Sequence, residues 1–238
     1  MPVTGTTVDV VDIKGTGYDP YDPVEDMGGA HGEINIQLTD DLGYTQEENY
    51  FWYDFSYVDE DSGETVVIKG WLNGDDEPVE RGTCTIVPGE GFMMKTEVEG
   101  FSLQSAGEVL TDADQPVELR ENLKLIANPT PVTVDLADCY VTGYDPYDPV
   151  EDMGGAHGEV NAQKTDDLGY TQEENYFWYD FSYVDEDSGE TVVVYGWLDG
   201  DDESIVRGDC TVDAGLGLLT KCEADGFNFV WPKVEIAK

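Results

Sequence analysis

The chain has 238 residues, of which 39% are hydrophobic and 11% aromatic. This apolar content is enough for a folded core, so the composition predicts a globular protein, and its acidity does not by itself imply disorder. The 53 Asp and Glu residues against 11 Lys and Arg residues give a formal net charge of −42. Such a charge repels phosphate backbones and anionic lipid surfaces, so we expect neither nucleic acid nor a membrane as a partner.

A tandem duplication dominates the sequence. Residues 16–67 and 142–193 are identical except at three of 52 positions. One offset of 126 residues (142 minus 16) also relates weaker matches on either side of this block, which predicts two units of about 100 residues, a common domain size. We expect a first β repeat at residues 1–103, a linker arm at 104–131, a second β repeat at 132–229 and a C-terminal tail at 230–238.

Each repeat shows the pattern of short strands separated by turns. In the segment NYFWYDFSYV, the side chains of Phe51, Tyr53, Phe55 and Tyr57 fall on one face, a period of two that indicates a strand. The turn DEDSGE then predicts a hairpin with the segment TVVIKGWL. Further strands are expected in the first repeat at 32–38, 81–87 and 92–101. The sequence therefore predicts an all-β fold of two tandem, near-identical β-sandwich or open-barrel domains joined by a structured linker.

The linker has its own pattern. Between Pro116 and Pro129, the segment VELRENLKLIAN is typical of a short helix or an edge strand. The unique sequence from Leu103 to Pro131 is too long for a passive hinge, so we expect it to pack as an arm.

The three differences inside the matched block fall on alternate residues, which places them on one face of one strand. A shared core would keep that face apolar, so we predict that it is covered differently in each repeat, by the linker, the sister repeat or a neighbouring chain. An ordinary exposed strand end would equally explain the lysine among them. A second outward difference is Lys69, which is replaced by Tyr195. The predicted assembly interface comprises Ile34, Ile36 and Leu38, their counterparts Val160, Ala162 and Lys164, and the pair Lys69 and Tyr195.

The segment YDPYDPVEDMGG is a loop that two prolines stiffen. Its tyrosines Tyr18 and Tyr21, with the copies Tyr144 and Tyr147, are expected to join the assembly interface because a loop has little core to receive them. The loop also gathers carboxylates, which calcium prefers as ligands, although the spacing is not that of an EF-hand. A calcium site would use Asp19, Asp22, Glu25 and Asp26, and again Asp145, Asp148, Glu151 and Asp152. We expect no other cofactor.

Residues suited to catalysis are few. The two histidines, His31 and His157, lie in the glycine-rich segment GGAHGE, where a structural turn histidine is the favoured interpretation. Carboxylate pairs for a hydrolase would arise by chance in so acidic a chain, so we expect no enzyme. The cysteines are expected as buried thiols, with a Cys210–Cys222 bridge across a hairpin as the alternative.

Two nearly equal patches on one chain favour a structural protein that self-assembles into a sheet, tube or shell, because heterologous contacts propagate. An acidic chain with TGYDPYDPVEDMGGAHGE in two similar regions, a unique segment between them and a short C-terminal extension resembles the pyrenoid shell proteins of diatoms and related algae. The resemblance implies a homo-polymer around the Rubisco matrix in the chloroplast stroma, with the matrix or another shell component as partner and with neither cofactor nor catalysis. Alternatives are a virion decoration or tail-tube protein and a calcium-dependent binding or adhesin module.

Overall fold

The computed structural model describes residues 7–20, 29–39, 45–96, 98–105, 113–119, 122–145, 156–165, 171–222 and 227–234. Within these ranges all longer elements are strands, the only helices being the single-turn 3-10 helices η1 (Val10–Asp12) and η3 (Leu136–Asp138). The all-β prediction is confirmed, and none of the described sheets closes into a barrel. No helix of the described residues is long and apolar enough to cross a membrane.

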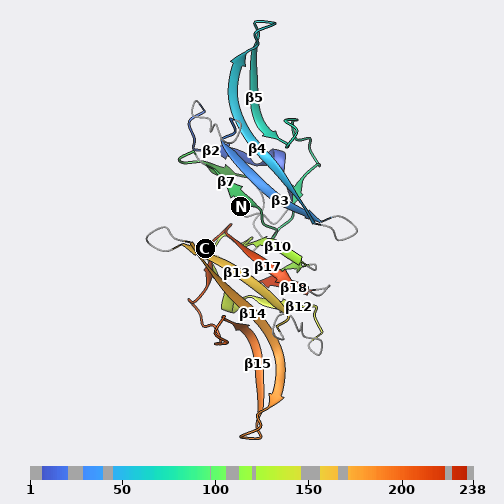
Figure 1. The fold of residues 1–238 in the computed structure, drawn as a ribbon, viewed down its shortest axis with the longest axis vertical. Helices are drawn as coiled ribbons and strands as arrows, with labels where there is room; N and C mark the ends of the chain where they lie inside the picture. Colours follow the sequence, from blue (N-terminus) through green and yellow to red (C-terminus); the bar gives the residue numbers. More distant parts are fainter. Residues whose placement is uncertain are drawn as a thin grey trace. The chain divides into compact units, whose positions relative to one another are not determined.

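The chain forms two compact units (Figure 1). Unit 1 contains residues 1–87 and 92–108, and unit 2 contains residues 88–91 and 109–238. The main sheet of unit 1 has the antiparallel order β5 (Thr65–Leu72), β4 (Thr45–Val58), β3 (Gly32–Thr39), β7 (Met93–Lys95). Two short pairs complete it, β1 (Val8–Asp9) with β6 (Thr85–Ile86) and β2 (Lys14–Thr16) with β8 (Ser102–Gln104).

Unit 2 repeats these elements in the same order and adds two strands. Its main sheet has the antiparallel order β10 (Asn122–Ala127), β17 (Gly217–Cys222), β13 (Gly158–Thr165), β14 (Thr171–Val184), β15 (Thr191–Leu198). A second sheet has the order β12 (Tyr140–Thr142), β18 (Phe227–Trp231), β9 (Gln115–Leu119), and β11 (Val134–Asp135) pairs with β16 (Thr211–Val212).

The two added strands, β9 and β10, come from the predicted linker. Each stands at the end of a sheet, which fits the edge-strand alternative and not the helix. Pro116 lies within β9, an acceptable place for proline because an edge strand does not need every N–H. On the outer side of β10, the amide of Gly91 donates to the carbonyl of Leu125 at 2.9 Å. The amide of Ala127 donates to the carbonyl of Gly89 at 2.7 Å. Because β9 pairs with β18 and β10 pairs with β17, both linker strands are part of unit 2.

Burial corrects the predicted role of the diverged strand face. Ile34 and Ile36 are 0% and 4% exposed and belong to the core of unit 1. Val160 and Ala162, at 1% and 5%, belong to the core of unit 2, which also contains linker residues such as Val117. A side chain enclosed in its own unit cannot contact a neighbouring chain, so we assign these four residues to the cores. The side chains of Leu38 and Lys164 lie outside the described residues.

A two-stranded ribbon extends from each main sheet. The first half of β4 pairs with β3, whereas its second half, from Tyr53 to Val58, pairs only with β5. The β14–β15 hairpin of unit 2 has the same pairing scheme. Figure 1 shows both hairpins running out beyond the rest of their own sheets. Because no third strand of the described residues pairs with them there, the ribbons expose side chains on both faces.

Candidate assembly surface

One face of each ribbon carries a ladder of aromatic rings. In unit 1 the rings of Tyr53 and Phe55 have centroids 5.7 Å apart, and those of Phe55 and Tyr57 are 6.2 Å apart. Across the hairpin Phe55 pairs with Ile68, and Tyr57 pairs with Val66. Charged residues of β4 such as Asp54 alternate onto the opposite face, so the ladder is uncharged. We call this side of the hairpin the ladder face.

The ladder face begins in a small buried cluster and ends exposed to solvent. At its base Tyr53 packs with Ala30, and both are buried. Toward the tip Tyr57 is 47% exposed, and in unit 2 its counterpart Tyr183 is 48% exposed. The same base forms in unit 2 around Tyr179. An exposed apolar strip of this kind is typical of an interaction surface.

The opposite face of the ribbon is also apolar near the tip. Val58 and Val67 are 61% and 67% exposed, and their counterparts Val184 and Val193 are 62% and 67% exposed. Residues from the start of β4 to Val67 are identical in the two repeats. The chain therefore presents the same exposed apolar surface twice.

Lys69 and Tyr195 lie on this opposite face, as the sequence predicts for an outward position. The Lys69 side chain is 62% exposed and its Nζ lies 2.6 Å from Oδ2 of Asp54. Tyr195 is 64% exposed and its ring contacts that of Trp178 edge-on, with centroids 5.2 Å apart. Their outward position is confirmed, and their part in assembly stays a prediction.

The loop tyrosines have a different role from the one predicted. The hydroxyl of Tyr18 accepts a hydrogen bond from Nε1 of Trp52 at 2.7 Å and donates one to Oδ2 of Asp54 at 2.8 Å. Tyr144 occupies the equivalent place in unit 2, and burial is the main cause that raises its pKa to about 12. Because these hydroxyls are used inside their units, we remove Tyr18 and Tyr144 from the assembly surface. Tyr21 and Tyr147 lie outside the described residues.

The two histidines pack under these tyrosine rings. His31 is 0% exposed, its ring centroid lies 4.4 Å from that of Tyr18, and neither ring nitrogen has a hydrogen-bond partner among the described residues. His157 is 2% exposed and stacks on Tyr144 at 4.3 Å. Side chains that are closed to solvent cannot reach a substrate, so the structure favours a packing role for both histidines.

Only part of the predicted calcium site can be located. Asp19 and Asp145 are exposed, whereas Asp22, Glu25, Asp26, Asp148, Glu151 and Asp152 lie outside the described residues. In the part of the chain that the structure describes, no group of three or more His, Cys, Asp or Glu side chains is arranged to hold a metal ion. Calcium binding therefore stays a prediction.

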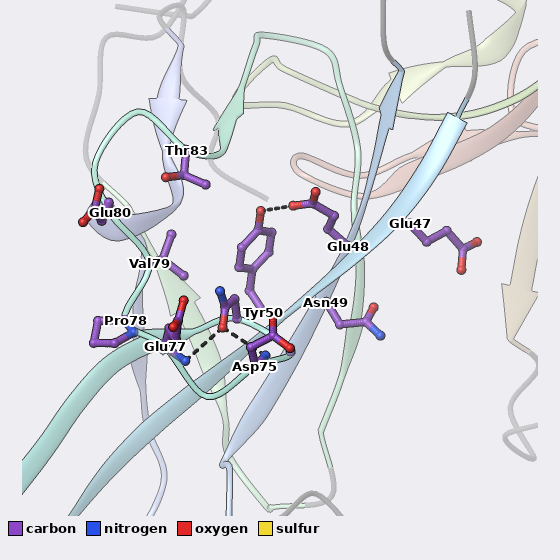
Figure 2. Close-up of a pocket in the computed structure, with 12 residues that line it drawn as sticks. Glu47, Glu48, Asn49, Tyr50, Asp75, Glu77, Pro78, Val79, Glu80 and Thr83 are labelled. Carbon is purple, nitrogen blue, oxygen red and sulfur yellow. Dashed lines mark hydrogen bonds between the residues drawn. The ribbon is translucent and has the colours of Figure 1, made fainter.

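Unit 1 contains an open acidic groove beside β4 (Figure 2). Its lining includes the carboxylates Glu47, Glu48, Asp75, Glu77 and Glu80. Figure 2 shows the Tyr50 hydroxyl pointing at Glu48, to which it donates a hydrogen bond. With so many like charges and no cation among the described lining residues, we interpret the groove as a solvated acidic face.

The described residues include all four cysteines, and no disulfide joins any of them. The Cys210–Cys222 bridge considered from the sequence is absent, and all four side chains are buried. Burial raises the pKa of the Cys139 thiol well above its usual value, which lowers its reactivity. Buried thiols, the favoured interpretation, are confirmed.

No protein-family model, no curated protein and no solved structure matches this chain. The function must therefore be argued from the residues of the chain itself. The most distinctive surface feature of the described residues is the pair of exposed apolar ribbons.

Proposed function

We propose that this chain is a non-enzymatic structural protein that self-assembles into a sheet, tube or shell. The observation that carries the proposal is the ladder face, an uncharged aromatic strip on a projecting ribbon that occurs twice with the same exposed residues. Exposure of such an apolar strip to water does not stabilise a monomer, whereas its burial in a contact between molecules is favourable. Two copies of the strip on one chain give each molecule two attachment points, the minimum for a polymer.

The charge of the chain sets the condition for assembly. A net charge of −42 opposes close packing of copies, so ions must screen it before short-range apolar contacts can form. Because the ladder faces carry no charge themselves, burial of one against another leaves no ion unpaired. Assembly should therefore start only above a threshold of ionic strength. The proposed function requires no cofactor.

A pyrenoid shell is the setting that we propose for such a polymer. The support is the architecture that the sequence shares with the shell proteins of diatoms and related algae, namely two similar acidic regions with a unique segment between them. In that setting the lattice would lie in the chloroplast stroma and enclose the Rubisco matrix, which would be its partner on one side.

The proposal is tested by negative-stain microscopy of the purified chain over a series of salt concentrations. We expect sheets or tubes at moderate salt. The variant Tyr57→Ser with Tyr183→Ser removes the exposed end of both ladder faces and should stay monomeric. The control Val206→Ser removes a side chain that is 64% exposed and lies off the ribbons, so it should assemble normally. Monodisperse wild-type monomers at every salt concentration would contradict the proposal.

A further inference from the structure

Unit 2 has an aromatic pocket at the base of its ribbon, where β15 lies beside η3 and the first residue of β12. The pocket has a volume of about 280 Å³, and the rings of Tyr140, Trp178, Tyr195 and Trp197 line it together with Asp138. Trp178 makes edge contacts with both Tyr195 and Trp197, with ring centroids 5.2 Å apart in each case. We call this site the aromatic pocket. The ladder faces do not account for it, because it lies on the other side of the hairpin.

Unit 1 has lysines where the aromatic pocket has tyrosines. The offset of 126 residues relates Tyr140 to Lys14 and Tyr195 to Lys69. The tryptophans and the aspartate of the pocket are unchanged, as Trp52, Trp71 and Asp12. Lys14 is exposed, and the Lys69 side chain is 62% exposed although its Nζ pairs with Asp54 at 2.6 Å, so both ammonium groups are on the surface. Two of only 11 basic residues in the chain therefore mark one place in unit 1, which we call the lysine face.

We infer that the aromatic pocket of one copy receives the lysine face of a second copy. This inference rests on the proposed function and adds the contact that joins neighbours. Trp178 and Trp197 are 2% and 4% exposed, whereas Tyr195 is 64% exposed, so an incoming ammonium group meets the tyrosine rings. Such a group is attracted to the face of an aromatic ring, and the attraction grows as water leaves the contact. The lysine stem is apolar and can lie along the ring edges, while the head reaches the polar rim.

The charges of the two sites favour this contact. Two copies that each carry a charge of −42 repel one another on average. An attractive contact must therefore bring one of the few basic sites to a site that attracts cations. Asp138, at the edge of the aromatic pocket, is neutralised by Arg207, whose nitrogen lies 2.5 Å from its Oδ1. Asp114 accepts a hydrogen bond from the Tyr140 hydroxyl at 2.9 Å and adds a negative charge beside this ring, which attracts an incoming ammonium group.

The contact also gives the polymer a direction. The ladder faces are the same in both repeats, so they do not distinguish one repeat from the other. The lysine face belongs to unit 1 and the aromatic pocket to unit 2, so their contact is heterologous and joins copies head to tail. Such a contact leaves one lysine face and one aromatic pocket open at the ends of every chain of copies.

The test uses two variants in which each repeat takes the residues of its sister. Lys14→Tyr with Lys69→Tyr gives a molecule with two tyrosine sites, and Tyr140→Lys with Tyr195→Lys gives one with two lysine sites. Each new residue already occupies the equivalent position of the sister repeat, so both variants should fold. Circular dichroism and thermal unfolding test whether they do. Light scattering then measures the protein concentration at which assembly begins.

Each variant alone lacks one half of the contact. We expect its threshold concentration to rise by roughly tenfold or more, and we expect an equimolar mixture of the two to return to the wild-type threshold. Wild-type thresholds for the separate variants, or a mixture that fails to recover, would overturn the inference while leaving self-assembly intact. A wild-type chain that never assembles would instead overturn the proposed function. If either double variant misfolds, the single changes Lys69→Tyr and Tyr195→Lys provide the same mixing test.

Discussion

The indole Nε1 of Trp178 donates a hydrogen bond of 3.0 Å to the hydroxyl of Tyr144, and that hydroxyl donates to Asp180 at 2.8 Å. Trp178 is 2% exposed, so its N–H has little access to water. The relay ties the segment after β12 to β14, 34 residues further along the chain. Unit 1 repeats the relay around Tyr18.

Replacing Tyr144 by Phe should destabilise unit 2. The change removes the acceptor of a buried N–H, and an unsatisfied buried donor costs about 1–3 kcal/mol. Urea denaturation followed by tryptophan fluorescence measures the loss. The control Tyr183→Phe alters an exposed ring and should change the free energy of unfolding by less than about 0.5 kcal/mol. Equal effects of the two changes would show that the relay does not contribute to stability.

The raised pKa of Tyr144 predicts a loss of stability at high pH. The pKa is about 12 in the folded chain against an ordinary value of 10.0, mainly because burial disfavours the phenolate. Between these values the unfolded chain releases the proton while the folded chain keeps it, so the contribution is complete below pH 10 and is lost as pH rises to about 12.

Denaturation at stepped alkaline pH, compared between wild type and Tyr144→Phe, isolates this contribution. The difference in unfolding free energy between them should shrink as pH increases through this range. Tyrosinate absorbance of the folded wild type reports the pKa independently. A difference that stays constant up to pH 12 would contradict the assignment.

Gly158 lies against an aromatic ring and should not accept a side chain. A Cβ at this position would be 2.3 Å from the Phe227 ring, which is 1% exposed and packs in the core of unit 2. Gly158→Ala should therefore lower the unfolding free energy by about 1–3 kcal/mol through overpacking. A Cβ at Gly200 would meet open space, so Gly200→Ala is the matched control and should stay within about 1 kcal/mol of wild type. Similar stability of the two variants would argue against this packing.

The core position of Ile36 gives a direct test of its corrected role. Ile36→Lys would place a charge in the core of unit 1, at a cost of several kcal/mol, and unit 1 should lose its folded structure. Val67→Lys, at a position 67% exposed on the same unit, should fold normally. Circular dichroism and proteolysis distinguish the two. A folded Ile36→Lys variant that fails only to polymerise would restore the interface interpretation.

The period of two in β4 was enough to predict its two faces from the sequence, and only the structure shows which core each face joins. Alternation placed Tyr50 and Trp52 on one face and Tyr53 on the other, and the structure puts the first two in the main core and Tyr53 in the small cluster at the base of the ladder face. The turn residues between β4 and β5 likewise predicted the hairpin, because short-range backbone preferences decide turns.

The diverged face of β3 and β13 is covered differently in the two units, in unit 2 with linker residues, but its assignment to an assembly interface was wrong because its side chains lie in the cores. Ile36 and Ala162 differ in size, yet both are buried, and the core around Ala162 includes Val117 from the linker. The pair Lys14 and Tyr140 was not predicted, and its significance comes from the folded unit, where Tyr140 lines one pocket with Tyr195. A position-by-position comparison along the full offset of 126 residues would have found it.

The sequence by itself determined the all-β class, the duplication and the alternation within the longest strands, because these depend on local patterns and on direct identity. Only the tertiary structure decided which strands leave their sheets as ribbons, that the linker strands belong to unit 2, and that Tyr140 and Tyr195 line one pocket. These outcomes depend on contacts between residues far apart in the chain, and the free energy of such contacts is set by how whole sheets pack.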